Sequence, residues 1–123
     1  MRTKILLVDD SAAVRRSLRA SLEDQADWQV CGEAENGQEG VEMAQELSPD
    51  LVILDLSMPV MNGIDAARQI RKITPNAYIL LYTLHASPQL LEEARKAGID
   101  DVLSKSSWSG GRVLRAIRSL FAA

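Results

Sequence analysis

Five polar residues of this sequence each stand at the end of, or just beyond, a short run of apolar residues: Asp9, Asp10, Asp55, Thr83 and Lys105. Three of them are carboxylates, and folding that gathers them would make them repel each other. For unit charges about 5 Å apart at an effective dielectric of ~20, each pair costs roughly 3 kcal/mol. Such a cluster either raises a carboxyl pKa or binds a cation.

A cation at this cluster would have oxygen ligands, with no histidine or cysteine among the candidates. Hard oxygen ligands favour magnesium over zinc, and magnesium held by a few carboxylates keeps positions open for phosphate oxygens. Lys105 adds a positive charge suited to a phosphoryl group, and Thr83 adds a hydroxyl donor. Asp55 is then a candidate nucleophile that carries phosphate as an acyl phosphate, because phosphoryl transfer needs mainly positioning and charge neutralisation.

These residues need a frame that brings strand ends together. The run Leu51-Val52-Ile53-Leu54 is too short for a membrane-spanning helix and follows Pro49. It is typical of a strand buried on both faces of a parallel sheet. Other strands are predicted at 4–8, 28–34, 78–82 and 102–103.

Helices are predicted between the strands, at about 11–24, 38–47, 64–74, 87–98 and 109–121. In the first helix, Ser11 is a candidate cap, and residues four apart form the inward face: Val14, Leu18 and Leu22. Arginines that fall largely outside this face are predicted to be solvated: Arg15, Arg16 and Arg19. Asn36-Gly37 is predicted to be a turn, and Gly98 a left-handed helix stop.

The order strand–helix, repeated five times, predicts an α/β fold with a doubly wound, five-stranded parallel sheet covered by helices on both faces. Right-handed crossovers leave few arrangements. The flavodoxin-like (βα)5 order 2-1-3-4-5 places the first and third strands side by side at the switch point. The two acidic strand ends would then share one crevice.

Composition and charge narrow the classes of function. The chain has 123 residues, is 46% hydrophobic and 25% charged, and carries a net charge of −3. These values are typical of one globular domain and argue against a general electrostatic grip on nucleic acid or anionic membrane. A single cysteine, Cys31, excludes an internal disulfide. No apolar run approaches the ~18 residues of a membrane span and no signal peptide is apparent, so we expect a cytoplasmic protein.

The five residues and their surroundings resemble the response-regulator receiver (CheY-like) domain of two-component signalling. The resemblance covers Asp9-Asp10, Asp55 within LVILDLSMPVMNG, Thr83 within ILLYT and Lys105 within DDVLSK. The stretch GEAENGQEG and the segment PDLVILDLSMPVMNGIDAARQIRK are similar to the NarL/FixJ-type (LuxR-type) subgroup. The resemblance runs over about residues 4–120, so residues 1–123 are expected to form a single receiver domain with no output domain in this chain.

The resemblance implies a role for each residue. Asp55 accepts phosphate from a phosphohistidine of a sensor histidine kinase or phosphotransfer protein. Mg²⁺ is bound by Asp10, Asp55 and the backbone carbonyl of Ser57, while Asp9 acts through water. Lys105 pairs with the phosphoryl group, and Thr83 turns inward to bond it, which changes the surface of the fourth helix, fifth strand and fifth helix.

A receiver of this kind assists its own phosphorylation and dephosphorylation, and it is a switch rather than a turnover enzyme. The resemblance also implies control of an output such as transcription, with DNA contacted only through a separate output domain. Homodimerisation is a further implied possibility. No membrane contact is expected.

Some positions depart from the family pattern. Val102 stands where an aromatic residue is usual, Leu84 where a small residue is usual, and Ser106 where proline is usual. These departures motivate an alternative, a receiver-like interaction module that acts without phosphorylation. A third hypothesis, a flavin-binding electron carrier, is disfavoured because the acidic Asp9-Asp10 pair has the wrong charge for a phosphate loop. The arginines of the last predicted helix, Arg112, Arg115 and Arg118, are expected to form a solvated face.

Overall fold

The computed structural model describes residues 2–84, 86–105 and 110–122. Strands and helices alternate along the chain: β1 (Thr3–Val8), α1 (Ala12–Glu23), β2 (Trp28–Ala34), α2 (Gly37–Leu47), β3 (Leu51–Leu54), α3 (Gly63–Ile73), β4 (Tyr78–Thr83), α4 (Pro88–Lys96), β5 (Asp101–Ser104) and α5 (Gly110–Phe121). The predicted order is confirmed, with bounds that differ by one or two residues. The predicted start of the last helix at residue 109 lies outside the described residues.

The strands form one parallel sheet in the order β2-β1-β3-β4-β5, as predicted. The strand β3 lies in the middle, and every one of its residues is buried. Parallel pairing requires a crossover between consecutive strands, and each crossover here carries one helix. The sheet therefore delivers all its strand ends to the same edge.

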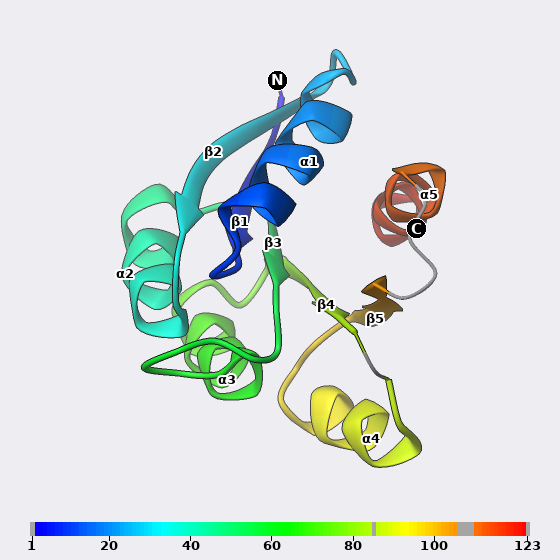
Figure 1. The fold of residues 1–123 in the computed structure, drawn as a ribbon. Coiled ribbons are helices and arrows are strands. Elements are labelled where there is room, and N and C mark those ends of the chain that lie inside the picture. Colours follow the sequence, from blue (N-terminus) through cyan, green and yellow to red (C-terminus); the bar gives the residue numbers. More distant parts are fainter. Residues whose placement is uncertain (1, 85, 106–109, 123) are drawn as a thin grey trace.

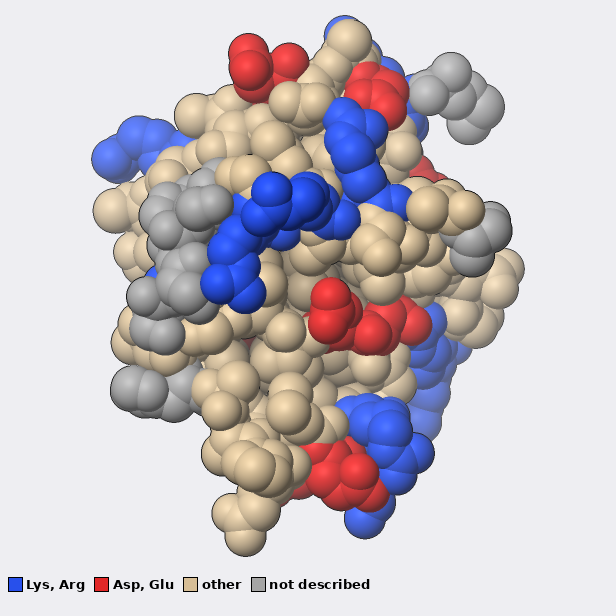
Figure 2. All heavy atoms as spheres, turned by 90° about the vertical axis from the view of Figure 1, so that its right-hand side faces the viewer, with Lys and Arg blue, Asp and Glu red and all other residues tan. Residues whose placement is uncertain are grey.

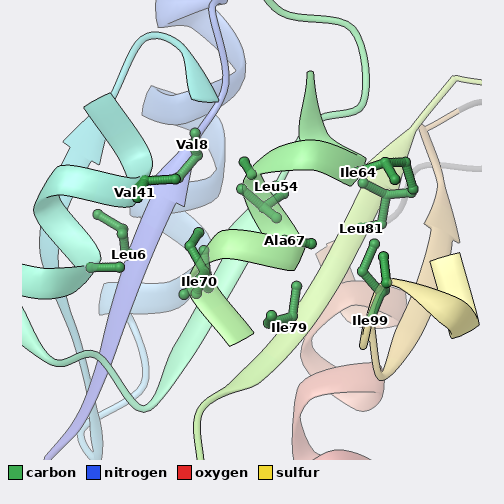
Figure 3. Packing of buried hydrophobic residues seen from close by; sticks show 14 of the residues in the cluster. Leu6, Val8, Val41, Leu54, Ile64, Ala67, Ile70, Ile79, Leu81 and Ile99 are labelled. Atoms are coloured by element: carbon green, nitrogen blue, oxygen red, sulfur yellow. The ribbon is translucent and has the colours of Figure 1, made fainter. Parts of the chain in front are cut away.

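The helices form a layer on each face of the sheet (Figure 1). The helices α1 and α5 cover one face, where their apolar residues pack with Ile5, Leu7 and Ile53. The helices α2, α3 and α4 cover the other face. Figure 3 shows the core on that side, to which Leu54 of β3 and Ile64 of α3 both contribute. Alternate residues of one strand thus enter opposite cores, which explains why β3 and residues 5–8 of β1 are all apolar.

Side-chain caps fix where several helices begin. The Ser11 hydroxyl accepts a hydrogen bond from the Val14 N–H at 3.2 Å, and Asn62 caps α3 through the Asp65 N–H at 2.9 Å. Asn36-Gly37, predicted to be a turn, is instead the start of α2, with Asn36 as its cap. Asparagine suits both roles because its side chain bonds backbone N–H groups two or three residues ahead.

The predicted helix stop at Gly98 is confirmed. Gly98 has φ +89° and follows α4 after the capping residue Ala97. Within the described parts of the chain, no helix is both long enough and apolar enough to cross a membrane.

The prediction for the arginines of α1 is wrong at one position. Arg15 is 9% exposed, whereas Arg16 is exposed as predicted. The apolar pattern of α1 did not reveal this burial because the guanidinium finds ionic and backbone partners that no periodicity records.

The arginines of α5 lie at the surface, as predicted. Figure 2 views the side of the molecule where α4 and α5 lie and shows basic side chains gathered in a band across it. Arg118 is more than a solvated charge. It donates to the Gln25 side chain at 2.6 Å and lies 4.6 Å from the centre of the Trp28 ring. This residue therefore joins α5 to the segment between α1 and β2.

Candidate phosphoacceptor site

The pairing of β1 with β3 places two carboxylates side by side. Val8 lies opposite Leu54, so Asp9 and Asp55 leave neighbouring strands at the same edge. The Asp55 N–H donates to the Val8 carbonyl at 2.9 Å, which extends the hydrogen-bond ladder as far as this residue. Backbone hydrogen bonds thus determine the position of Asp55 independently of the contacts that its side chain makes.

Three carboxylates gather at this edge. Asp9, Asp10 and Asp55 each offer one oxygen, and these oxygens all lie within 4.8 Å of one another. Asp9 is 2% exposed and Asp55 is 8% exposed, whereas Asp10 is exposed. The cluster is therefore shielded on its inner side and reachable from solvent on its outer side.

Lys105 contacts two of the three carboxylates. Its Nζ lies 2.8 Å from Asp9 Oδ2 and 3.1 Å from Asp55 Oδ1. The same atom lies 5.4 Å from the centre of the Tyr82 ring. Because Lys105 follows β5 and Asp9 follows β1, its side chain crosses the strand ends that lie between them. Thr83, the last residue of β4, is buried and lines the same hollow.

Burial and like charge both act on Asp55. Burial raises the pKa of its carboxyl group, Asp9 raises it further, and Lys105 only partly offsets them. For Lys105, burial alone would lower the pKa, but the hydrogen bond and charge of Asp9 and the charge of Asp55 leave it raised. Burial, with the charge of Asp9, also raises the pKa of Tyr82 to about 12. The ammonium of Lys105 is outnumbered by the carboxylates around it, which leaves the site with an excess of negative charge.

The loop between β3 and α3 closes one side of the site. The Gly63 N–H donates to the Leu56 carbonyl at 2.8 Å. A Cβ atom at Gly63 would lie 2.2 Å from the carbonyl oxygen of Asp55. This approach is closer than a side chain permits, so the glycine is needed to bring the loop against the strand end. Ser57, within this loop, is exposed and lines the hollow.

A hollow of about 470 Å³ opens over these groups. It is lined by residues from four strand ends and the start of α1: Asp9, Asp10, Ser11, Val14, Asp55, Leu56, Ser57, Thr83, Leu84 and Lys105. Leu84, one of the departures from the family pattern, is 59% exposed and also lines an adjoining, mainly apolar cavity of about 270 Å³. Val102 is half-buried in β5, opposite Leu81. Ser106 lies outside the described residues.

The donor set fits a hard divalent cation. Asp9, Asp10 and Asp55 offer only oxygen atoms, and Ser57 lines the same hollow. Oxygen ligands with net negative charge are the set that magnesium prefers, and soft metals prefer sulfur or imidazole. The residues predicted from the sequence therefore form a chemically consistent group.

One contact behind the site was not predicted from the sequence. Arg15 donates to the backbone carbonyl of Asp9 and also pairs with Glu33 of β2. A signal for it existed, since Glu33 is an acidic residue inside a predicted strand and needs a partner there. Nothing in the spacing of the residues identified Arg15 as that partner.

Comparisons with known proteins agree with this geometry. Residues 5–118 match the response regulator receiver domain family. The chain is 41% identical over 120 residues to the chemotaxis protein CheY of Thermotoga maritima, with 98% of each chain covered.

Solved structures give the same result. The response regulator domain of Thermotoga maritima CheB superposes with a TM-score of 0.91 at 31% identity, covering 100% of this chain and 98% of that one. A LuxR-family response regulator from Aurantimonas superposes with a TM-score of 0.92 at 32% identity, covering 99% and 86%. Chemotaxis and LuxR-type receivers are thus similarly near, and the predicted NarL/FixJ-type subgroup is not singled out. This chain belongs to the response regulator receiver domain family.

Proposed function

We propose that this chain is a phosphoacceptor signalling switch in which Asp55 receives a phosphoryl group from a sensor histidine kinase or phosphotransfer protein. The observation that carries the proposal is the position of Lys105, whose ammonium lies 2.8 Å from Asp9 and 3.1 Å from Asp55. A cation placed between a candidate nucleophile and a candidate metal ligand is what phosphoryl transfer to a carboxylate requires.

The chemical step forms one bond and breaks one. An Asp55 carboxylate oxygen bonds to phosphorus while the bond from phosphorus to the donor's imidazole nitrogen breaks, and the electron pair leaves with the imidazole. Asp10, Asp55 and the Ser57 carbonyl would hold Mg²⁺, with Asp9 beside them. When bound, magnesium supplies positive charge next to the phosphoryl oxygens.

Lys105 has the central role among the chain's own residues. Its ammonium neutralises Asp55 before the transfer and pairs with the added phosphoryl oxygens after it. The hydroxyl of Thr83 is a hydrogen-bond donor for the same group. A new partner for Thr83 would change the segment from β4 to α4, and with it the surface formed by α4, β5 and α5.

The test is phosphorylation by a small donor. Incubation with Mg²⁺ and acetyl phosphate, followed by intact mass measurement, should show one phosphoryl adduct. Asp55→Asn and Asp55→Ala should show none. Asp27→Asn, which changes an exposed aspartate elsewhere in the chain, should be phosphorylated like the wild type. Absence of any adduct on the wild type, from acetyl phosphate or from a phosphorylated kinase, would refute the proposal.

The alternative is an interaction module that acts without phosphorylation. Two observations favour it: Leu84 is largely exposed and lines the hollow, and Val102 stands where the family usually has an aromatic residue, which is one proposed route for the signal. Equal binding of a partner protein to the wild type and to Asp55→Ala would support the alternative, and a large difference would exclude it.

The wider role also forms part of the proposal. A receiver of this family would control an output such as transcription through a separate domain, which alone would contact DNA. Homodimerisation is tested by light scattering before and after phosphorylation. A rise in molecular mass that depends on Asp55 would indicate that the switch acts through assembly.

A further inference from the structure

Arg15 is a buried charged residue on the inner side of α1, 9% exposed. Burial of a guanidinium is costly unless ion pairs and hydrogen bonds compensate it. Here Nε donates to Glu33 Oε1 at 2.9 Å, and Nη1 donates to the backbone carbonyl of Asp9 at 2.6 Å. Nη2 lies 3.9 Å from Glu35. Arg15 therefore joins β2 to the first acidic residue of the site.

The carbonyl that Arg15 contacts belongs to the peptide bond between Asp9 and Asp10. Because a peptide bond is planar, fixing the direction of this carbonyl also fixes the N–H of Asp10 and restricts the position of its Cα atom. The Asp9 N–H is held as well, since it donates to the Ala34 carbonyl at 3.1 Å. Two consecutive residues of β2, Glu33 through Arg15 and Ala34 directly, thus hold both backbone groups of Asp9.

We propose that Arg15, anchored by Glu33, is a positioning residue that orients the Asp9–Asp10 peptide so that the Asp10 carboxylate binds a divalent cation together with Asp55, with the Asp9 carboxylate beside it. This inference rests on the proposed function. It adds a connection from the surface of β2 to the cation site, through a residue that itself touches neither the cation nor the phosphoryl group.

Arg19 provides a matched control on the same helix. Its Nε donates to the other Glu33 oxygen at 2.7 Å, and its Nη1 lies 3.3 Å from Glu23. Among the described residues, its hydrogen bonds and ion pairs go to these two glutamates and none goes to Asp9. Arg15→Gln and Arg19→Gln each remove one positive charge, but only the first removes the contact with the Asp9 carbonyl.

The two possible effects of Arg15→Gln have opposite signs. Loss of a positive charge near the acidic cluster would strengthen the binding of a cation. Loss of positioning would weaken it. Residues that orient metal ligands typically change metal affinity 10–100-fold when removed, so a positioning role exceeds the charge effect and reverses its direction.

The experiment is isothermal titration of the full chain with Mg²⁺ alone. Arg15→Gln should raise the Kd about tenfold, whereas Arg19→Gln should stay within about twofold of the wild type. Phosphorylation by acetyl phosphate should require correspondingly more Mg²⁺ in Arg15→Gln, with the rate at saturating Mg²⁺ changed much less. An unchanged or lowered Kd in Arg15→Gln would overturn the inference.

Further variants keep the test decisive. Arg15→Lys retains the charge without the forked geometry that reaches both partners, so its Kd should lie between those of the wild type and Arg15→Gln. If Arg15→Gln does not fold, Arg15→Lys carries the test alone, because it keeps the positive charge and a Kd equal to that of the wild type would then overturn the positioning role. A wild type that neither binds Mg²⁺ nor accepts phosphate refutes the proposed function. A wild type that does both, beside an Arg15→Gln variant that matches it, refutes only the positioning role.

Discussion

The two ends of the sheet differ in whether their charged side chains are fully paired. At the carboxyl end, charged side chains contact one another, and Lys105 is shared between Asp9 and Asp55. Asp10 adds a third carboxylate to the same cluster. The negative charge exceeds what Lys105 can neutralise, so this end of the sheet has capacity for a ligand.

At the amino end, the donors of a charged side chain are satisfied mainly by backbone carbonyls. The Arg71 guanidinium donates at 2.6 to 3.1 Å to the carboxylate of Asp100 and to three backbone carbonyls, those of Pro75, Ala77 and Gly98. Asp100 in turn accepts the Ile79 N–H at 2.8 Å. Arg71 thereby ties the end of α3 to the starts of β4 and β5.

The difference shows how one sheet serves two purposes. A charge whose donors all have partners stabilises the fold and has nothing left to offer a ligand. A charge cluster with an excess of one sign costs stability until a ligand arrives, which is the usual compromise at functional sites. Variants at the amino end should therefore change stability without changing phosphorylation, whereas variants at the carboxyl end should change phosphorylation.

Gly63→Ala should produce the largest effect, because it disturbs the functional end through its backbone. The new methyl group would lie 2.2 Å from the Asp55 carbonyl oxygen and 3.1 Å from the Leu56 Cα atom. Neither atom can move without displacing the strand end. We expect a loss of about 3 kcal/mol in the free energy of unfolding, measured in urea, together with loss of phosphorylation by acetyl phosphate.

Gly32→Ala is the matched control for this substitution. Its new methyl group would meet the end of the Leu47 side chain at 2.9 Å, and that side chain can rotate away. The cost should stay below about 1 kcal/mol, with phosphorylation retained. Equal losses in the two variants would show that the tight contact between Gly63 and Asp55 is unimportant.

Arg71→Gln should lower stability without affecting the site. It leaves carbonyls at the amino end without their donor, and we expect a loss of about 2 kcal/mol. The Kd for Mg²⁺ should not change. Arg68→Gln, one turn away, removes an exposed ion pair with Asp65 at 3.0 Å and should cost less than about 0.5 kcal/mol. A weakened Mg²⁺ affinity in Arg71→Gln would show that the two ends are coupled.

Asp55→Asn should have the opposite effect on stability. Burial and Asp9 raise the pKa of Asp55 in the folded state, so folding favours its protonated form and the ionised form costs stability. That cost is absent below the unfolded pKa and grows as pH rises through the folded pKa. In the absence of Mg²⁺ at pH 7, the free energy of unfolding of the variant should therefore be about 1 kcal/mol higher than that of the wild type. A less stable variant would mean that the ion pair between Lys105 and Asp55 stabilises the folded state by more than burial and repulsion of the Asp55 charge destabilise it.

The fold was predictable from the sequence because its signals are local. Buried strands such as Leu51–Leu54 are apolar throughout, and proline, glycine and asparagine mark the ends of the helices. The order of strands then followed from general rules of handedness and from the polar residues at the strand ends. Asn36 was misassigned to a turn because a turn and a helix cap use the same side-chain chemistry.

The site was predictable only as far as strand ends determine it. Asp9 and Asp55 follow from sheet register, whereas Lys105 reaches them across intervening strands with a flexible side chain. Arg15 was placed in solvent because helical periodicity describes apolar residues and says nothing of a guanidinium paired with Glu33. Long-range ionic contacts of this kind depend on tertiary structure, which a single sequence does not specify.

Glu33 supplies a small predicted effect and the sharpest contrast with Asp55. Burial opposes the shift, but hydrogen bonds from Arg19 and Arg15 lower the pKa of Glu33. A lowered pKa stabilises the folded state above the unfolded pKa, and this contribution disappears as pH falls through the folded pKa. Solvent screens the pair, since the Glu33 side chain is 30% exposed and that of Arg19 is 38% exposed, so we expect only about 0.5 kcal/mol at pH 7.

Urea titrations between neutral and acid pH measure this contribution. Stability of the wild type should fall more steeply toward acid than that of Glu33→Gln, and the two curves should converge at the lowest pH. Glu23→Gln, which removes only the 3.3 Å contact with Arg19, should retain the slope of the wild type. In Asp55→Asn the slope should change in the opposite sense, because Asp55 costs stability as it ionises and Glu33 contributes stability as it does so. Parallel curves for Glu33→Gln and the wild type would mean that the Arg15–Glu33 pair contributes no net stability, leaving positioning of the Asp9–Asp10 peptide as its only role.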